Sequence, residues 1–353
     1  MDKNRHAGLL HIAQKQMIDM KKYTLLTLFA VLLLQQSFAQ STIQQEERLS
    51  GYKGDFTPEV TLPKDGFTFL ALGDFGRVGE YYQKDVAAEL GRAAITLDAE
   101  FVVSVGDNFY PSGVASTQDQ HWKSSFEEIY THPNLYKDWY AILGNHDYRG
   151  STKAQIDYTQ VSRRWNMPSP YYKKKFELED GSTLLMLFMD TNPFIDGYHG
   201  NSEKYPDLAK QDTAAQKKWL IESLSDTDPN IKWKIVVGHH PLYSGGKRKE
   251  SKDTKAFEAK FAGIFDQYGV QAYICGHEHD LQVIRPKNRF TTQFLTGAGS
   301  EVRPTGQRDG TLFAAAEPGF MAFTIAGDTL LVQTIQAKTG ATKLLNSISI
   351  KSK

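Results

Sequence analysis

Short apolar runs recur along the chain from Phe67 onward, and each ends abruptly in glycine followed by a polar residue. Runs of this length that are rich in valine, isoleucine and phenylalanine are typical of buried strands. We therefore predict a strand at each run. The five runs are Phe67–Leu72, Phe101–Val105, Trp139–Leu143, Trp233–Val237 and Gln271–Cys275.

Stretches whose apolar residues recur at helical spacing lie between these runs. Asp212 stands where it would cap the helix that begins at Ala214. Strands that alternate with helices indicate an α/β layer fold. The predicted helices are Gln83–Leu97, Gln120–Tyr130, Gln155–Trp165, Ala214–Leu224 and Thr254–Tyr268.

The pattern changes beyond Phe290, where the helical spacing stops and β-strands are predicted instead. A second sheet packed on the first is the simplest arrangement. The segment from Phe67 to Ile350 contains no linker, no repeat and no low-complexity tract, which indicates one domain. The further predicted strands are Leu184–Met189, Thr292–Leu295, Phe320–Ala326, Leu330–Ala337 and Leu345–Ile350.

The N-terminal segment has the pattern of a secretory signal peptide. Two lysines precede the apolar run Tyr23–Leu34, and Ser37 and Ala39 supply the small residues that a signal peptidase requires. An anchor helix is the alternative, although the run is short for a membrane span. We expect residues 1–39 to be a signal peptide with its true start at Met20, residues 40–65 to be a polar leader and residues 66–353 to be a single domain.

Charge and cysteine content narrow the possible partners. The chain carries 41 basic and 41 acidic side chains, so its net charge is zero. We therefore expect it to bind neither a nucleic acid nor a membrane surface through a polybasic segment. Its single cysteine, Cys275, allows no intramolecular disulfide, and no cysteine stands at the cleavage site to carry a lipid anchor. We expect an exported protein, periplasmic or secreted, that depends on a large core or on bound metal for its stability.

Polar residues follow the ends of the five predicted strands. The carboxyl ends of strands in an α/β sheet share an edge at which ligands bind. A glycine before each polar residue lets the backbone turn sharply and pack close to a bound ion. One such pair is usually a turn, whereas five pairs that each end an apolar run are difficult to attribute to turns. The five polar residues are Asp74, Asp107, Asn145, His239 and His277.

Three further side chains extend this set. Tyr110 follows Asp107 in a short loop, His146 follows Asn145, and His279 lies two residues after His277. Carboxylate, amide and imidazole ligands without thiolate suit iron, zinc or manganese better than a structural zinc site. Because the pKa of tyrosine is about 10, only a strong Lewis acid holds the phenolate at moderate pH. Ferric iron fits that requirement better than a divalent ion.

In this order, the motifs Gly-Asp, Gly-Asp-Asn-x-Tyr, Gly-Asn-His-Asp, Gly-His and Gly-His-x-His resemble the purple acid phosphatases of the calcineurin-like metallophosphoesterase superfamily. The likeness is closest to the small, tartrate-resistant type, extends to Gln155–Tyr172 and Gly297–Gly299, and covers about Phe69–Gly299. It implies a four-layer αββα sandwich of two mixed sheets flanked by helices. It also implies a binuclear-metal acid phosphatase that hydrolyses phosphomonoesters by attack of a metal-bound hydroxide on phosphorus.

The resemblance also implies roles for individual residues. The ligands of the ferric ion would be Asp74, Asp107, Tyr110 and His279. The ligands of a divalent ion (iron, zinc or manganese) would be Asn145, His239 and His277, with Asp107 bridging both ions. His240 is the alternative to His239 as a ligand and would otherwise form part of the pocket wall.

His146 is the candidate proton donor to the leaving group, because imidazole titrates in the useful range. Its alternative role is to orient Asn145 or a bound phosphate. Similar enzymes usually carry a further histidine at the pocket rim after the Gly-His-x-Pro segment, whereas this chain has no histidine between His240 and His277. The proton donor and the leaving-group preference therefore stay open.

A basic run stands where the rim histidine is expected. The side chains of Lys247, Arg248 and Lys249 could attract polyanionic substrates such as nucleotides or phosphoproteins, although a solvated loop is the more frequent role of such a run. A phosphodiesterase or nucleotide pyrophosphatase of the same superfamily is the rival function, and Tyr110 disfavours it because many of those enzymes lack the tyrosine. A phosphate-binding protein without turnover would be expected to lack a ligand, and none is missing.

Overall fold

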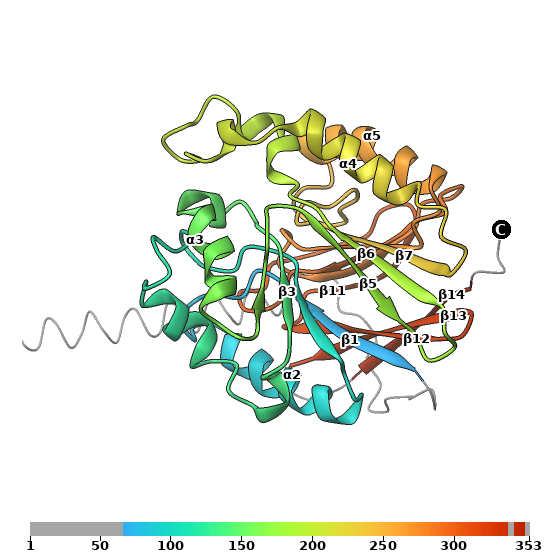
Figure 1. The fold of residues 1–353 in the computed structure, drawn as a ribbon, viewed down its shortest axis with the longest axis horizontal. Coiled ribbons are helices and arrows are strands. Elements are labelled where there is room, and N and C mark those ends of the chain that lie inside the picture. Colours follow the sequence, from blue (N-terminus) through green and yellow to red (C-terminus); the bar gives the residue numbers. More distant parts are fainter. Residues whose placement is uncertain (1–65, 338–341, 350–353) are drawn as a thin grey trace, which may run out of the picture. The chain divides into compact units, whose positions relative to one another are not determined.

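The described part of the chain, residues 66–337 and 342–349 of a computed structural model, forms two seven-stranded sheets (Figure 1). In spatial order, the first sheet consists of β14 (Thr342–Ser349), β13 (Thr329–Gln336), β12 (Gly319–Ala326), β1 (Phe67–Leu72), β2 (Phe101–Ser104), β3 (Trp139–Ala141) and β4 (Trp165–Asn166). The second consists of β11 (Thr311–Ala315), β9 (Leu281–Ile284), β10 (Thr292–Thr296), β8 (Ala272–Cys275), β7 (Ile231–Val237), β6 (Thr183–Phe188) and β5 (Tyr172–Glu177).

Both sheets are mixed. β1 pairs in parallel with β2 and antiparallel with β12, while β8 pairs in parallel with both β7 and β10. The late strands β12, β13 and β14 therefore extend the first sheet instead of forming a second one. The strands that precede the predicted ligands are divided between the sheets, β1, β2 and β3 in one and β7 and β8 in the other, so the ligands do not share one sheet edge.

In the described part of the chain, four α-helices cover the sheets: α2 (Gln83–Thr96), α3 (Thr152–Asp157), α4 (Thr213–Leu224) and α5 (Lys252–Gln267). In Figure 1, α4 and α5 lie over the second sheet and α2 lies beneath the first. As predicted, Asp212 caps α4, since its Oδ1 accepts the N–H of Ala215 at 2.9 Å. The four-layer αββα arrangement implied by the sequence is confirmed.

Two predicted helices differ from the observed structure. The predicted helix Gln120–Tyr130 is helical over residues 121–127, but its part Lys123–Glu127 is a π-helix, and α3 ends well before Trp165. The cause is aromatic packing: Trp122 stacks on Tyr158 at 3.5 Å, and Trp165 pairs with Trp139 as part of β4. Burial of these rings outweighs the local helical preference.

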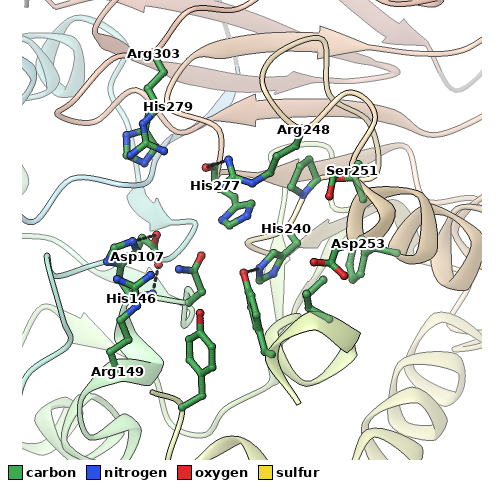
Figure 2. Close-up of a pocket in the computed structure, with 17 residues that line it drawn as sticks. Asp107, His146, Arg149, His240, Arg248, Ser251, Asp253, His277, His279 and Arg303 are labelled. Carbon is green, nitrogen blue, oxygen red and sulfur yellow. Dashed lines mark hydrogen bonds and ion pairs between the residues drawn. The ribbon is translucent and has the colours of Figure 1, made fainter. Parts of the chain in front are cut away.

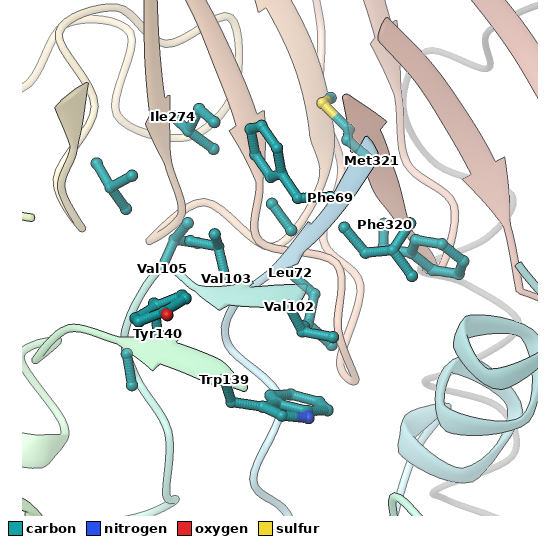
Figure 3. Packing of buried hydrophobic residues seen from close by; sticks show 14 of the residues in the cluster. Phe69, Leu72, Val102, Val103, Val105, Trp139, Tyr140, Ile274, Phe320 and Met321 are labelled. Carbon is teal, nitrogen blue, oxygen red and sulfur yellow. The ribbon is translucent and has the colours of Figure 1, made fainter. Parts of the chain in front are cut away.

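The main core lies between the two sheets. Phe69 stacks between its register partners Phe101 and Phe323, at 5.1 and 5.0 Å. Figure 3 shows Phe69 with other buried residues of this core, among them Val103 and Ile274. Along β6, Leu184 packs into this core, whereas Leu185 packs into a second cluster with the helices α4 and α5. The second sheet is therefore buried on both faces, which explains its continuous apolar runs.

The predicted signal peptide and leader lie outside the described residues. All described residues belong to one compact unit. In the ranges 66–337 and 342–349, no helix is long and apolar enough to cross a membrane.

Candidate metal centre

The backbone turns sharply at the strand ends that carry the predicted ligands. Asp74, Asp107 and His277 have φ angles of 58°, 51° and 72°, in the left-handed region that residues other than glycine seldom adopt. Such a conformation costs about 1–3 kcal/mol and persists only where the surroundings impose it. The loops after β1, β2 and β8 thus hold these side chains in a constrained inward orientation.

Glycines allow the ligand loops to pack directly on one another. A Cβ atom on Gly144 would lie 2.2 Å from the backbone nitrogen of Asp107, and one on Gly276 would lie 2.5 Å from Asp74 Oδ2. The sequence suggested glycine for sharp turns. The structure adds that these positions have no room for a side chain.

One group of ligand atoms gathers around a phenol. Tyr110 Oη lies 2.9 Å from Asp74 Oδ1, 2.9 Å from Asp107 Oδ2 and 3.2 Å from His279 Nε2. His279 Nε2 is also 3.5 Å from Asp74 Oδ1. We call these four residues the tyrosine cluster. They are the residues predicted to bind the ferric ion.

A second group gathers around two imidazoles. His277 Nδ1 lies 3.1 Å from His239 Nε2 and 2.8 Å from the side-chain amide of Asn145. We call these three residues the amide cluster. His239 Nε2 is 3.5 Å from Asp107 Oδ2, the same oxygen that lies beside Tyr110. Asp107 Oδ2 therefore stands between the two clusters.

The two adjacent histidines differ in what their nitrogens contact. His239 Nδ1 bonds the carbonyl of Val105 at 2.9 Å, which leaves Nε2 facing Asp107. Both nitrogens of His240 are occupied, Nδ1 by Thr191 Oγ1 at 2.7 Å and Nε2 by Tyr198 Oη at 2.8 Å. His239 thus has a ring nitrogen directed at the clusters, and His240 forms part of the pocket wall.

The electrostatics of the site favour bound cations. Burial raises the pKa of Asp74 to about 7, an effect that His239 opposes and the neighbouring Asp107 carboxylate reinforces. Burial and the same two carboxylates raise the pKa of Tyr110 well above its usual value. Burial also opposes ionisation of Asp107, but His239 and His146 hold its pKa well below the usual range. Two carboxylates and a phenol in a buried site fit a centre that supplies positive charge.

The amide of Asn145 supplies a separate test of this fit. Its oxygen faces His277 Nδ1, while its nitrogen faces the N–H of His146 and the guanidinium of Arg149, both at 3.2 Å. Hydrogen bonding alone would favour the reversed amide. If both the amide oxygen and the His277 nitrogen coordinate a cation, the amide orientation seen in the structure becomes the favourable one. The donor set therefore fits a metal ion.

His146 lies beside the clusters with one nitrogen fixed. Its Nδ1 is 2.7 Å from the carbonyl of Pro111, and its Nε2 is 4.0 Å from Asp107 Oδ2. Burial lowers the pKa of His146, and Asp107 opposes that shift. Asp147, the next residue, accepts hydrogen bonds from the N–H groups of Asn108 and Gly144 and so braces the loop.

Several supporting residues carried no recognisable sequence signal. Glu301 Oε2 lies 3.4 Å from His279 Nδ1 and also contacts Arg77 and Arg303. Burial would raise the pKa of Glu301, but His279 and the two arginines hold it below the usual range. Partners of this kind orient a ligating imidazole. The guanidinium of Arg77 also covers the ring of Tyr110 at 3.8 Å.

A cavity of about 290 Å³ opens above the clusters (Figure 2). His146 and Arg149 lie on one side of it, and His240, Arg248 and Asp253 lie on the other. Of the basic run, only Arg248 lines the cavity, where its Nη1 contacts Glu278 at 3.1 Å; the neighbouring lysines are exposed. Two tyrosines and a third arginine also line it: Tyr198, Tyr205 and Arg303.

Comparison with known proteins agrees with this geometry. The calcineurin-like phosphoesterase family matches residues 67–281. Purple acid phosphatase 7 of Arabidopsis thaliana is 36% identical over 278 residues, which cover 75% of this chain and 81% of that protein. Tartrate-resistant acid phosphatase type 5 of Mus musculus is 32% identical over 256 residues, which cover 69% of this chain and 76% of that protein.

One solved structure is similar over most of its length. GAP50, described as the anchor in the inner membrane complex of Plasmodium, superposes with a TM-score of 0.68 at 23% identity, over 82% of this chain and 91% of that one. At this identity the likeness shows a common fold.

Proposed function

This chain belongs to the purple acid phosphatases, within the calcineurin-like phosphoesterase family, and from that membership we propose how its residues hold the binuclear metal centre of the family. The protein is a metal-dependent phosphoric monoester hydrolase, an acid phosphatase, as the sequence motifs implied. Its substrates are small phosphorylated molecules. The individual ligands, the metals and the proton donor are matters of proposal.

We propose that the tyrosine cluster binds a ferric ion and the amide cluster a divalent ion, with Asp107 bridging both. The observation that carries this assignment is the position of Asp107 Oδ2, 2.9 Å from Tyr110 Oη and 3.5 Å from His239 Nε2. Its second oxygen is occupied by the N–H of His146 at 2.7 Å. One carboxylate oxygen is therefore available to both clusters.

The composition of each cluster supports the choice of metal. Two carboxylates and a phenol carry the negative charge that a trivalent ion requires, whereas a neutral amide and two imidazoles suit a divalent iron, zinc or manganese. When bound, two such metal ions lower the pKa of a coordinated water molecule and neutralise the charge on the phosphoryl oxygens of the substrate. His239 is the proposed ligand in preference to His240, since both nitrogens of His240 are already bonded.

His146 is the proposed proton donor to the leaving group. The carbonyl of Pro111 accepts a hydrogen bond from Nδ1–H, so Nε2 is the atom that exchanges a proton with a bound substrate. Asp107 stands 4.0 Å from that nitrogen and stabilises its protonated form. A histidine in this position would give a proton to an alkoxide as the phosphate ester breaks.

The cavity wall supports recognition of a phosphate dianion. Arg149, Arg248 and Arg303 line the cavity, and guanidinium groups form strong charge-assisted bonds to phosphate. We propose that substrates with several phosphates or acidic surroundings, such as nucleotides or phosphoproteins, bind here. The signal-peptide pattern of residues 1–39 supports the further proposal that the enzyme acts in the periplasm or outside the cell.

The test of the ferric assignment is the visible absorption of the purified protein. A phenolate bound to ferric iron absorbs by charge transfer, so we expect a coloured wild-type protein that contains iron. The Tyr110→Phe variant should be colourless. A colourless wild-type protein that holds only divalent metal would exclude ferric iron. Rates of hydrolysis of a phosphomonoester and a phosphodiester, measured on the same sample, give the enzyme's preference between the two substrate classes.

A further inference from the structure

Tyr198 lies on the cavity wall in the 3₁₀ turn Asp196–Tyr198, which follows β6. Its side chain is half-buried, and its ring packs against that of Tyr205 at 4.7 Å. No motif in the sequence marks it. Its hydroxyl group bonds His240, the histidine that is not among the proposed ligands, at 2.8 Å.

The direction of this hydrogen bond is fixed by Thr191. The Oγ1 atom of Thr191 accepts the backbone N–H of His239 at 3.2 Å and that of His240 at 3.1 Å. A hydroxyl oxygen has two lone pairs, so both are used and its own hydrogen must be donated. The ring atom His240 Nδ1, at 2.7 Å, is the acceptor.

A histidine that accepts at Nδ1 carries its hydrogen on Nε2. His240 Nε2–H therefore donates to Tyr198 Oη, which acts as the acceptor in this contact. The hydroxyl hydrogen of Tyr198 is left for another partner. Among the described residues, the hydroxyl has no second hydrogen bond, and the side chain borders the cavity.

We propose that Tyr198 donates a hydrogen bond to a phosphate oxygen of the bound substrate, and that Thr191 and His240 position it for this. The proposal rests on the proposed phosphatase function, because it places substrate phosphate in this cavity. Tyr198 is then a catalytic residue on the side of the cavity where the basic run replaces the rim histidine. It stabilises negative charge by a hydrogen bond, while His146 moves the proton.

The test is a Tyr198→Phe variant, which keeps the ring and removes only the hydroxyl. We expect kcat/KM for an aryl phosphate to fall roughly 10- to 100-fold, the range for a lost bond to a charged oxygen. We expect the Kd for inorganic phosphate, measured by calorimetry on the metal-loaded protein, to rise roughly tenfold, with metal content unchanged. Tyr136→Phe is the matched control, since Tyr136 is 49% exposed and does not line this cavity.

A double-mutant cycle tests the positioning role of Thr191. In Thr191→Ala, His240 Nδ1 no longer receives a hydrogen, so the ring can accept from Tyr198 and withdraw that donor from the cavity. Thr191→Ser keeps the hydroxyl and should restore phosphate affinity. The double variant, Thr191→Ala with Tyr198→Phe, should bind phosphate little more weakly than the weaker-binding of the two single variants. Additive losses would contradict the positioning role.

Two results would overturn the role of Tyr198. One is a Tyr198→Phe variant within twofold of wild type in both kcat/KM and phosphate affinity. The other is a loss accompanied by an equal loss of metal, which would show a structural role. If the wild-type protein hydrolysed no phosphate ester, the proposed function would fail, yet phosphate binding would still report on Tyr198 independently.

Discussion

The floor and the rim of the cavity are built in different ways. The floor consists of the tyrosine and amide clusters, whose residues are at most 8% exposed and whose positions follow directly from strand ends in the two sheets. The rim consists of Arg149, Tyr198 and Arg248, which are partly exposed and stand in loops and short turns. The floor thus fixes the chemistry, whereas the rim is free to vary in what it recognises.

Hydrogen bonding shows the same contrast. In the floor, each ligand is held by a backbone turn or by a neighbouring ligand. In the rim, the side chains are held by only one or two contacts and border the cavity: Arg248 Nη1 is held by Glu278 and the carbonyl of His277, and Tyr198 Oη by His240. Loss of a floor residue should therefore abolish turnover, while loss of a rim residue should change affinity and substrate preference.

The largest effect is expected from Asp107→Asn, which breaks the floor at the oxygen shared by both clusters. An amide lacks the negative charge needed to bridge two cations, so both metals should be lost and hydrolysis of an aryl phosphate should fall roughly 100-fold or more. Metal analysis and initial rates check this. Asp138→Asn, the same change at the exposed residue before β3, should behave as wild type. A normal metal content in the Asp107→Asn variant would contradict the proposed bridging role of Asp107.

An intermediate effect is expected from Glu301→Gln, which changes the link between floor and rim. Glu301 Oε2 lies 3.4 Å from His279 Nδ1 and pairs with Arg303, so we expect it to orient the imidazole when metal is bound. Removal of such a partner costs about 10- to 100-fold in metal affinity. Competition with a chelator measures that affinity, and Glu179→Gln, in the exposed turn between β5 and β6, is the control. Unchanged affinity would show that His279 needs no outer partner.

The smallest effect is expected from Arg248→Ala at the rim. KM for a phosphomonoester should rise roughly tenfold, as expected for loss of one charge-assisted bond, while kcat and metal content change little. Lys249→Ala is the matched control, because this exposed neighbour does not line the cavity. A fall in kcat with constant KM would place Arg248 among the residues that act on the transition state and so weaken the distinction between floor and rim.

Much of the floor could be predicted from the sequence because its construction is local. A glycine and a polar residue after each buried strand are visible without knowing which strands are neighbours. The spacing of His277 and His279 and the loop from Asp107 to Tyr110 likewise depend on short segments. The structure brings all the predicted ligands together, and the reason is that short loops leave little freedom after a strand ends.

The rim could not be predicted because it depends on distant contacts. Tyr198 Oη is held at the cavity by His240, which follows β7, 42 residues further along the chain. The division of strands between the sheets escaped prediction for the same reason. The edge strand β5 was missed because its sequence, Tyr172–Glu177, contains three consecutive lysines and exposes most of its side chains to solvent.

The division of the ligands between two sheets also affects folding. Asp74, Asp107, Tyr110 and Asn145 follow strands of the first sheet, and the three histidines follow strands of the second. Ions held by both groups would act as cross-links between the halves of the sandwich, in a chain whose single cysteine forms no disulfide. Ions that bind the folded state stabilise it by mass action. Both the thermal stability of the enzyme and its catalysis would then depend on the supply of metal.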